Sequence, residues 1–451
     1  MVGVARLTRA QTQERTRAAV LVAARAEFAE RGYRDVKVDA IAERAELTRG
    51  AVYSNFPGKR ALYLAVLADL VERTPPPPGA RPGRTLEEAL GALARTWVTP
   101  VPDGIGRALP PELAGEVADV LGALAGVNAV LLGLATEALA GVRWDGPIHT
   151  RRVRLAELVL ALLHGARQLD SLPGGAGAPG AYDVVSACER LAGLVMDDWW
   201  APAEPAVEAR EDDREWVTPE GLVDLVRGRG IAPGDGVGAV LGDGLFPTSD
   251  DGLAAVSGAL LALMSDGGPG TVPDDGSASA PDNGSVAVPG GGPVAVPAGG
   301  SVAVPGGEVA AAPGGDSVAV PADGVVAVPG DGVVAVLGVR RWDAVERVAR
   351  CGVPVTIALV TDTPTEVLPL VRAVVGELCA AVRVAFPETA WPEVRLVCDP
   401  GGRLATAAGF AETGDTTEAA ALLSGGRVVA TAEGTGAVTA VLGVRSLSRE
   451  G

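Results

Sequence analysis

One stretch, residues 38–59, constrains the fold of this chain more than any other. It begins with apolar residues at helical spacing, which predict a short helix with one buried face: Val38, Ile41, Ala42 and Ala45. A turn follows, and Thr48 is a good N-cap for a second helix because its hydroxyl accepts a backbone N–H left free at the helix start. Pro57-Gly58 ends that helix. The stretch therefore predicts a helix, a tight turn and a second helix.

The second helix divides into two faces. Val52 and Phe56 are four residues apart and are predicted to point inward. Polar side chains suited to phosphates and base edges remain on the outer face and the leading end: Arg49, Tyr53, Ser54 and Asn55. This is the arrangement that places one helix in the major groove of DNA. A helical hairpin in an ordinary bundle is the alternative.

The charge distribution favours the nucleic-acid interpretation. Residues 1–73 contain 13 Lys or Arg against 9 Asp or Glu, although the whole chain has a net charge of −18. A basic head on an acidic body allows phosphate attraction to orient the head on DNA.

The run from Arg15 to Leu70 resembles the N-terminal DNA-binding domain of TetR-type (TetR/AcrR) transcriptional regulators. The motifs that carry the resemblance are FAERGY, IAERA, TRGAVY, NF and KRAL. The resemblance implies an all-helical homodimer that binds double-stranded DNA at a palindromic operator and acts as a repressor. It also implies that DNA affinity falls when a small-molecule effector, here unknown, binds the helices that follow.

The predicted DNA-binding residues are Lys37, Thr48, Arg49, Gly50, Tyr53, Ser54, Asn55 and Lys59. Two positions depart from the family pattern. Val38 stands where a small hydroxylated residue usually contacts a phosphate, and Lys37 beside it can substitute in part. Glu46 stands where the turn usually has Gly, and the left-handed conformation expected there costs a non-glycine residue about 1 kcal/mol.

Composition excludes several classes of protein. The four cysteines form no CxxC pair, and the two histidines supply no metal-ligand spacing, so we expect reduced thiols, no metal site and no cofactor. The first residues lack the apolar core of a signal peptide, and no run of about 18 apolar residues is present. The sequence therefore predicts a cytoplasmic protein without a membrane partner, and not an enzyme.

Residues 74–200 are expected to form a helical ligand-binding and dimerisation domain. Predicted helices span 85–97, 111–120, 121–140, 148–169 and 181–198. The last two carry apolar stripes typical of a four-helix dimer interface: Val153, Ala156, Leu160 and Leu163, then Val184, Cys188, Leu191 and Val195. Four polar or aromatic residues in or near apolar segments are the candidate effector contacts: Trp97, Asn128, Trp144 and His164.

Residues 201–332 are predicted to be an acidic, low-complexity linker. Two short helical patterns, 218–228 and 251–264, come first. Val-Ala-Val-Pro or a close variant then recurs every eight residues from Pro289 to Pro329, and Ile231–Val339 contains no Lys or Arg against twelve Asp or Glu. A proline in every unit removes a ladder donor, which disfavours a sheet and leaves a β-solenoid as the alternative. The last copy, near Val333, is expected to be a real strand.

Residues 333–451 are predicted to be α/β. Strands are expected at 333–339, 353–360, 394–398, 419–424 and 427–432, with helices at 342–350 and 364–383. The segments VTIALVTDTPTEV, VRLVCDPGGRLATAAG and TTEAAALLSGGRVVA resemble a thioredoxin-like domain. The whole chain is therefore expected to be multidomain, with a helix-turn-helix at 1–73, a helical bundle, the linker and this α/β domain.

The thioredoxin-like resemblance fails where its chemistry would lie. Residues 361–365 read Thr-Asp-Thr-Pro-Thr where the redox dithiol would stand, and Thr416 replaces the expected cis-proline. Without a thiolate the exchange reaction has no nucleophile, so the domain is predicted to be redox-inactive. Two alternatives to a ligand-responsive regulator stay open. One is a thiol-based redox sensor using Cys351, Cys379 or Cys398, and the other is a thiol oxidoreductase carried by this domain.

Overall fold

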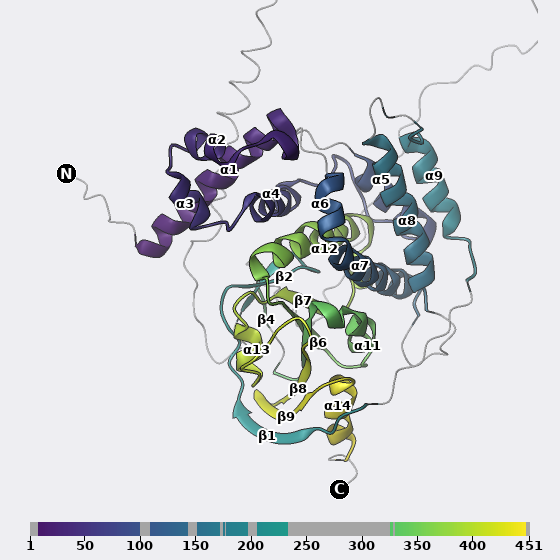
Figure 1. The fold of residues 1–451 in the computed structure, drawn as a ribbon. Coiled ribbons are helices and arrows are strands. Elements are labelled where there is room, and N and C mark those ends of the chain that lie inside the picture. The colour runs from purple at the N-terminus through teal and green to yellow at the C-terminus, as the bar shows by residue number, and fades with distance from the viewer. Residues whose placement is uncertain are drawn as a thin grey trace, which may run out of the picture. The chain divides into compact units, whose positions relative to one another are not determined.

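The structure, a computed structural model, describes residues 8–99, 109–142, 151–171, 175, 177–196, 205–232, 325–327 and 330–447. These residues belong to one unit that joins the N-terminal and C-terminal parts of the chain (Figure 1). The eight-residue repeats before Val325 and the helix expected at 251–264 lie outside the described residues.

The first four helices form the predicted head: α1 (Arg9–Asp35), α2 (Val38–Arg44), α3 (Arg49–Tyr53) and α4 (Lys59–Arg73). Thr8 and Gln11 form a capping box at the start of α1. Gly32 has φ +71° and interrupts α1 near its C-terminal end. The core of the head comes from the stripes expected on both sides of the turn: Val20, Ala24, Phe28, Ile41, Val52 and Phe56.

The turn between α2 and α3 adopts the backbone that the family pattern predicts. Glu46 has φ +55° and is the only non-glycine residue with positive φ in the described part of the chain. The neighbouring Leu47 N–H bonds the Ala42 carbonyl at 2.9 Å, which closes the end of α2. The chain therefore makes the family turn without the glycine.

The bundle comprises α5 (Leu86–Val98), α6 (Pro111–Glu116), α7 (Ala118–Leu139), α8 (Val153–Asp170) and α9 (Ala181–Leu191). The predicted interface stripe on α8 faces inward, since Val153, Ala156, Leu160 and Leu163 are all buried within the same chain. The interpretation of those four residues as a surface for a partner is therefore wrong. On α9 the stripe splits, with Cys188 buried and Val195 beyond the helix end 95% exposed.

Helix α7 is the one described helix long and apolar enough to cross a membrane, judged by length and composition alone. Half of the apolar window is buried inside the protein, and the helix also contains the buried polar residues Asn128 and Glu137.

The C-terminal part is built on a mixed sheet whose central strands match the predicted ones: β5 (Gly332–Gly338), β6 (Val355–Val360), β7 (Val394–Cys398), β8 (Glu418–Ser424) and β9 (Arg427–Glu433). β5, β6 and β7 are parallel, and β8 and β9 are antiparallel to their neighbours. Every residue of β5 and β6 is buried, as expected for parallel strands covered on both faces. The sheet confirms an α/β arrangement, while the thioredoxin-like assignment stays a prediction.

Four further strands come from outside that predicted set. β1 (Arg210–Glu215) pairs with β9, and β2 (Leu222–Asp224), β3 (Arg229–Ala232) and β4 (Val325–Ala327) extend the other edge. The described sheet order is β1-β9-β8-β5-β6-β7-β2-β3-β4. Residues that the sequence assigned to the linker therefore belong to the sheet.

The helix predicted at 218–228 is wrong, because the segment forms the β2–β3 hairpin. Gly221 and Gly228 have φ of +72° and +64°, which interrupt a helix. Between them the buried carboxylate of Asp224 accepts N–H bonds from Val226 and Leu396. These pairings are tertiary contacts, and they override the local helical pattern.

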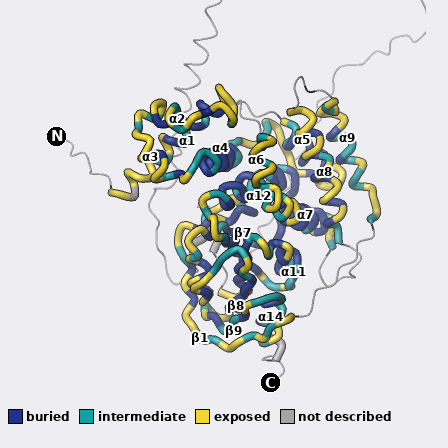
Figure 2. The backbone as a smooth tube through the Cα atoms, in the orientation of Figure 1, coloured by how far each residue is buried: buried dark blue, intermediate teal, exposed yellow. Residues whose placement is uncertain are grey.

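The remaining helices are α11 (Val345–Ala349), which follows the 3₁₀ helix η3 (Val339–Ala344), then α12 (Pro364–Ala385), α13 (Arg403–Ala407) and α14 (Ala437–Leu447); a second short 3₁₀ helix, η4 (Glu388–Ala390), follows α12. Helix α12 connects β6 to β7 and also packs along α4, α5 and α7 (Figure 1). Buried positions dominate both α4 and α12 (Figure 2). Helix α12 thus connects two strands of the sheet and also packs against the helices of the head and the bundle.

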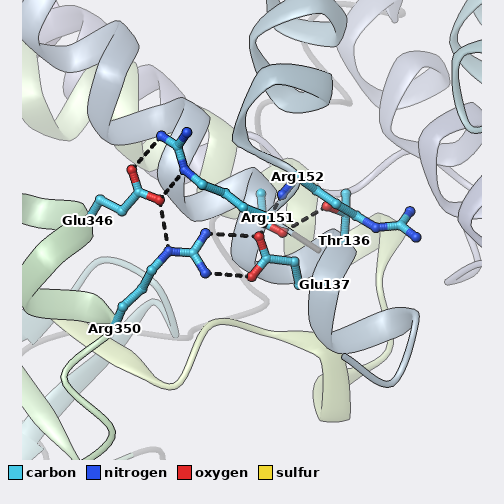
Figure 3. Close-up of polar contacts among 7 residues, drawn as sticks. Thr136, Glu137, Arg151, Arg152, Glu346 and Arg350 are labelled. Atoms are coloured by element: carbon cyan, nitrogen blue, oxygen red, sulfur yellow. Dashed lines mark hydrogen bonds and ion pairs between the residues drawn. The ribbon is translucent and has the colours of Figure 1, made fainter. Parts of the chain in front are cut away.

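A buried ionic network joins the bundle to the α/β region (Figure 3). Arg350, which follows α11 as its C-cap, makes two bonds of 2.8 and 2.9 Å to the Glu137 carboxylate of α7, and its side chain is 1% exposed. Its Nε bonds Glu346 at 2.8 Å, and Arg151 holds the same carboxylate through bonds of 2.6 and 2.7 Å. The Arg152 N–H adds a bond to Glu137, so each carboxylate has several donors.

We expect Glu46→Gly to raise the free energy of unfolding by about 1 kcal/mol, because glycine adopts the positive φ without the Cβ clash. Urea unfolding measures the change. Glu43→Gly, an exposed position inside α2, should lower stability by about 1 kcal/mol. If both substitutions destabilise equally, the turn carries no backbone strain.

We expect Arg350→Ala to lower the free energy of unfolding by about 3–5 kcal/mol, because it leaves Glu137 charged and buried without its partner. The matched control is Arg427→Ala, which breaks a pair with Asp213 whose side chains are 47% and 80% exposed. That change should cost at most about 1 kcal/mol. Equal losses of unfolding free energy in the two variants would show that the buried pair contributes no more to stability than an exposed pair.

Candidate nucleic-acid interface and ligand cavity

Helix α3 presents the polar face that the sequence predicts. The Thr48 hydroxyl accepts the Ala51 N–H at 3.2 Å and caps the helix. Val52 and Phe56 are buried, which fixes the rotation of α3 on the head. The outward residues Arg49, Gly50, Tyr53 and Ser54 are exposed together with Thr48.

Arg49 is oriented before any ligand arrives. Its guanidinium lies 5.3 Å from the centroid of the Tyr53 ring and forms an ion pair of 3.3 Å with Asp39. The bond to Tyr53, followed by the charge of Asp39, raises the pKa of Arg49, so the group stays cationic. Both Arg49 and Asp39 are more than 60% exposed, so a phosphate or a guanine edge can replace the carboxylate.

Three predicted DNA-binding residues have different surroundings. Lys37, at the N-cap of α2, is exposed and makes no capping bond. The Asn55 side-chain amide donates to the Ala51 carbonyl at 2.9 Å and so folds back on α3. Lys59 donates to the carbonyls of Arg34 and Val36 at the end of α1. Those carbonyls give Lys59 partners within the protein at the start of α4.

A cavity of about 660 Å³ lies between α4, α7, α8 and α12. This volume is in the range of small-molecule sites. Asn128 and His164, two of the four predicted effector residues, line it. Trp97 lies behind His164, with ring centroids 5.1 Å apart, and does not line the cavity. Trp144 lies outside the described residues.

His164 is a hydrogen-bonding group of α8 that lines the cavity. Its Nδ1 lies 2.8 Å from the Leu160 carbonyl, which can only accept, so Nδ1 carries the proton. Burial lowers the pKa of His164 below its ordinary value, and the bond to Leu160 opposes that shift only in part. With the proton on Nδ1, the neutral tautomer leaves Nε2 as an acceptor.

Sequence reasoning missed the ionic pair in the cavity wall. Arg167 of α8 makes two bonds to Glu377 of α12, at 2.8 and 3.0 Å, and stacks 4.3 Å over the Trp97 ring. α12 also supplies Leu370, Ala373 and Val374 to the lining. The signal available in the sequence was that α12 is apolar around most of its circumference, which predicts burial on more than one side.

The cysteines do not favour thiol chemistry. Burial raises the pKa of the Cys379 and Cys398 thiols to about 12 and also raises that of Cys351. A thiol that stays protonated at neutral pH is a poor nucleophile. The structure therefore offers no support for the redox-sensor or oxidoreductase interpretation.

Residues 20–66 match the model of bacterial regulatory proteins, tetR family. This match covers α2, α3 and most of α1 and α4, and it supports a DNA-binding transcriptional regulator of the TetR type. No curated protein matches the chain.

Solved structures give weaker similarities. RolR bound to resorcinol is 19% identical, with 43% of this chain and 100% of that chain covered and a TM-score of 0.27. FadR from Bacillus halodurans is 16% identical, with 40% and 99% covered and a TM-score of 0.27. NalD from Pseudomonas aeruginosa, titled a secondary repressor of the MexAB-OprM efflux pump, is 23% identical, with 41% and 99% covered and a TM-score of 0.27.

Proposed function

We propose that this protein is a ligand-responsive transcriptional repressor that binds a palindromic operator as a homodimer. The observation that carries the proposal is the exposed polar face of α3 inside a region that matches the tetR-family model. Arg49 and Tyr53 read base edges, while Lys37, Thr48, Gly50 and Ser54 contact phosphates. Asn55 and Lys59 reach DNA only if their present contacts open.

A dimer follows from the geometry of DNA recognition. One α3 helix reads one half-site, and two such helices must lie about 34 Å apart to enter successive major grooves. The outer side of α8 and the residues after α9 offer the partner surface, where Leu158, Leu169, Leu194 and Val195 are exposed. Exposed large apolar side chains of this kind mark protein interaction sites when they gather on one face.

The cavity supplies the effector response. Leu67, Leu70 and Val71 of α4 line it, and α4 is the last helix of the DNA-binding head. An effector that fits better when α4 has moved shifts the population away from the DNA-binding spacing by its difference in affinity for the two states.

Selection from random duplex DNA with the full-length protein tests the proposal. We expect a palindrome whose half-sites are about one helical turn apart. The affinity for that palindrome should fall with salt as several phosphates are neutralised. Enrichment of a single, non-repeated site would contradict the dimer, and no enrichment at all would contradict sequence-specific regulation.

We expect Arg49→Ala and Lys37→Ala to affect DNA binding in different ways. Arg49→Ala should cost about 1–3 kcal/mol in operator binding and relax the base preference at one position of each half-site. Lys37→Ala should weaken binding to all sequences alike and reduce the salt slope by about 1 for each subunit. Titration of operator and scrambled duplexes at several salt concentrations separates these effects. If Arg49→Ala weakens both duplexes equally, Arg49 does not read a base.

A further inference from the structure

We infer that the C-terminal α/β region completes the effector site, and that this site takes an apolar molecule carrying an N–H or O–H donor. That the bound ligand regulates DNA binding rests on the proposed function. The cavity and its lining residues do not depend on that proposal. Its walls come from segments about 300 residues apart in sequence, because Glu377 of α12 lines the same space as Leu70 and Val71 of α4.

Helix α12 is held in place by the sheet. Val371, Val375 and Leu378 are fully buried in a cluster that includes β5 and β6. Ion pairs of Arg372 with Glu72 and of Arg60 with Glu366 join α12 to α4. The α12 wall therefore depends on the α/β region being folded, and removal of that region would open the cavity.

The apolar body of the ligand follows from the lining. Leucine, valine and alanine side chains from all four principal helices face the cavity, including Leu67, Leu121, Leu160 and Leu370. An apolar molecule gains about 25 cal/mol for each Å² that it removes from water in such a site.

Most of the polar groups in the lining can accept a hydrogen bond from a ligand, and Gln168 offers both an amide acceptor and N–H donors. The Thr74 hydroxyl donates to the Leu70 carbonyl at 2.6 Å, so its oxygen can only accept a further bond. His164 offers Nε2, and the buried Asn128 Oδ1 has no partner among the described residues. Glu157 adds an exposed carboxylate.

Anionic ligands are disfavoured by the same contacts. Arg167 is the only Lys or Arg among the described lining residues, and both of its terminal nitrogens already bond Glu377. A carboxylate or sulfonate would have to break that pair and would also lie near Glu157. A hydroxyl or amine N–H meets the acceptors that are present.

A matched pair of fluorescent probes tests the inference with the full-length protein. N-phenylnaphthylamine is apolar and has one N–H donor, and anilinonaphthalene sulfonate adds a sulfonate to nearly the same rings. We expect one saturable N-phenylnaphthylamine site per chain and affinity for the sulfonate lower by about tenfold or more. Equal or tighter binding of the sulfonate would overturn the ligand class.

Substitutions on α12 test the wall. Val374→Trp fills the cavity from α12 and should lower the affinity for N-phenylnaphthylamine by about tenfold or more. The matched control Thr365→Trp, at the exposed start of α12, should bind like the wild type. Val374→Phe introduces a smaller ring, and it replaces the tryptophan variant if circular dichroism shows that variant to be unfolded. Unchanged affinity in a folded Val374 variant would overturn the composite site.

Measurement of operator affinity in the presence of the probe tests the ligand response separately from the composite site. If N-phenylnaphthylamine binds with the expected dependence on Val374 but leaves operator affinity unchanged, the composite site stands and the ligand response of the proposed function fails. If the probe lowers operator affinity in the wild type and in the Val374 variants alike, it acts elsewhere and the composite site is wrong.

Discussion

Glu137 and Arg350 are 213 residues apart in the chain and face one another inside the protein, where neither charge can reach water. Such a pair stabilises only if its geometry is good and its remaining hydrogen bonds are satisfied, and the Arg152 N–H, Glu346 and Arg151 provide that completion. Removal of one partner would leave an uncompensated charge. The network therefore joins Glu346 and Arg350 of the α/β region to Glu137 of α7 and to Arg151 and Arg152 before α8.

Helix α12 contacts both the sheet and the ligand cavity. It contacts β7 of the sheet, and it also lines the cavity together with α4, against which it packs. A DNA-binding head followed by a helical bundle would close its ligand site with its own helices. Here one wall is supplied by the crossover helix of an α/β region, so the bundle and the sheet share a single ligand space.

Local signals in the sequence were sufficient for the head. Thr48 as a cap and Val52 with Phe56 as the inner face depend on neighbours within a few residues. The positive φ of Glu46 was expected from the resemblance to the TetR-type domain. The strands from β5 to β9 were also predictable, because buried valine runs bounded by turn residues carry their own pattern. The hairpin β2–β3, the inward stripe of α8 and the contact of Lys59 with Val36 were not predictable, since each depends on a partner distant in the chain. The cavity residues were predictable only in part. Asn128 and His164 could be predicted as polar residues within apolar segments, whereas the role of Glu377 depends on the contact of α12 with Arg167 of α8.

The energetics of the α4–α12 contact suit a response to a small ligand. The ion pairs Arg372–Glu72 and Arg60–Glu366 involve side chains that are 30–43% exposed, and pairs of that kind contribute at most about 1 kcal/mol each. The buried Glu137–Arg350 pair, by contrast, resists displacement. A ligand that moves α4 relative to α12 breaks these weak ion pairs and also has to shift the apolar packing between the two helices, whose positions are mostly buried. An effect of about 1–3 kcal/mol on DNA binding, the usual size of an allosteric coupling, needs no larger rearrangement than this.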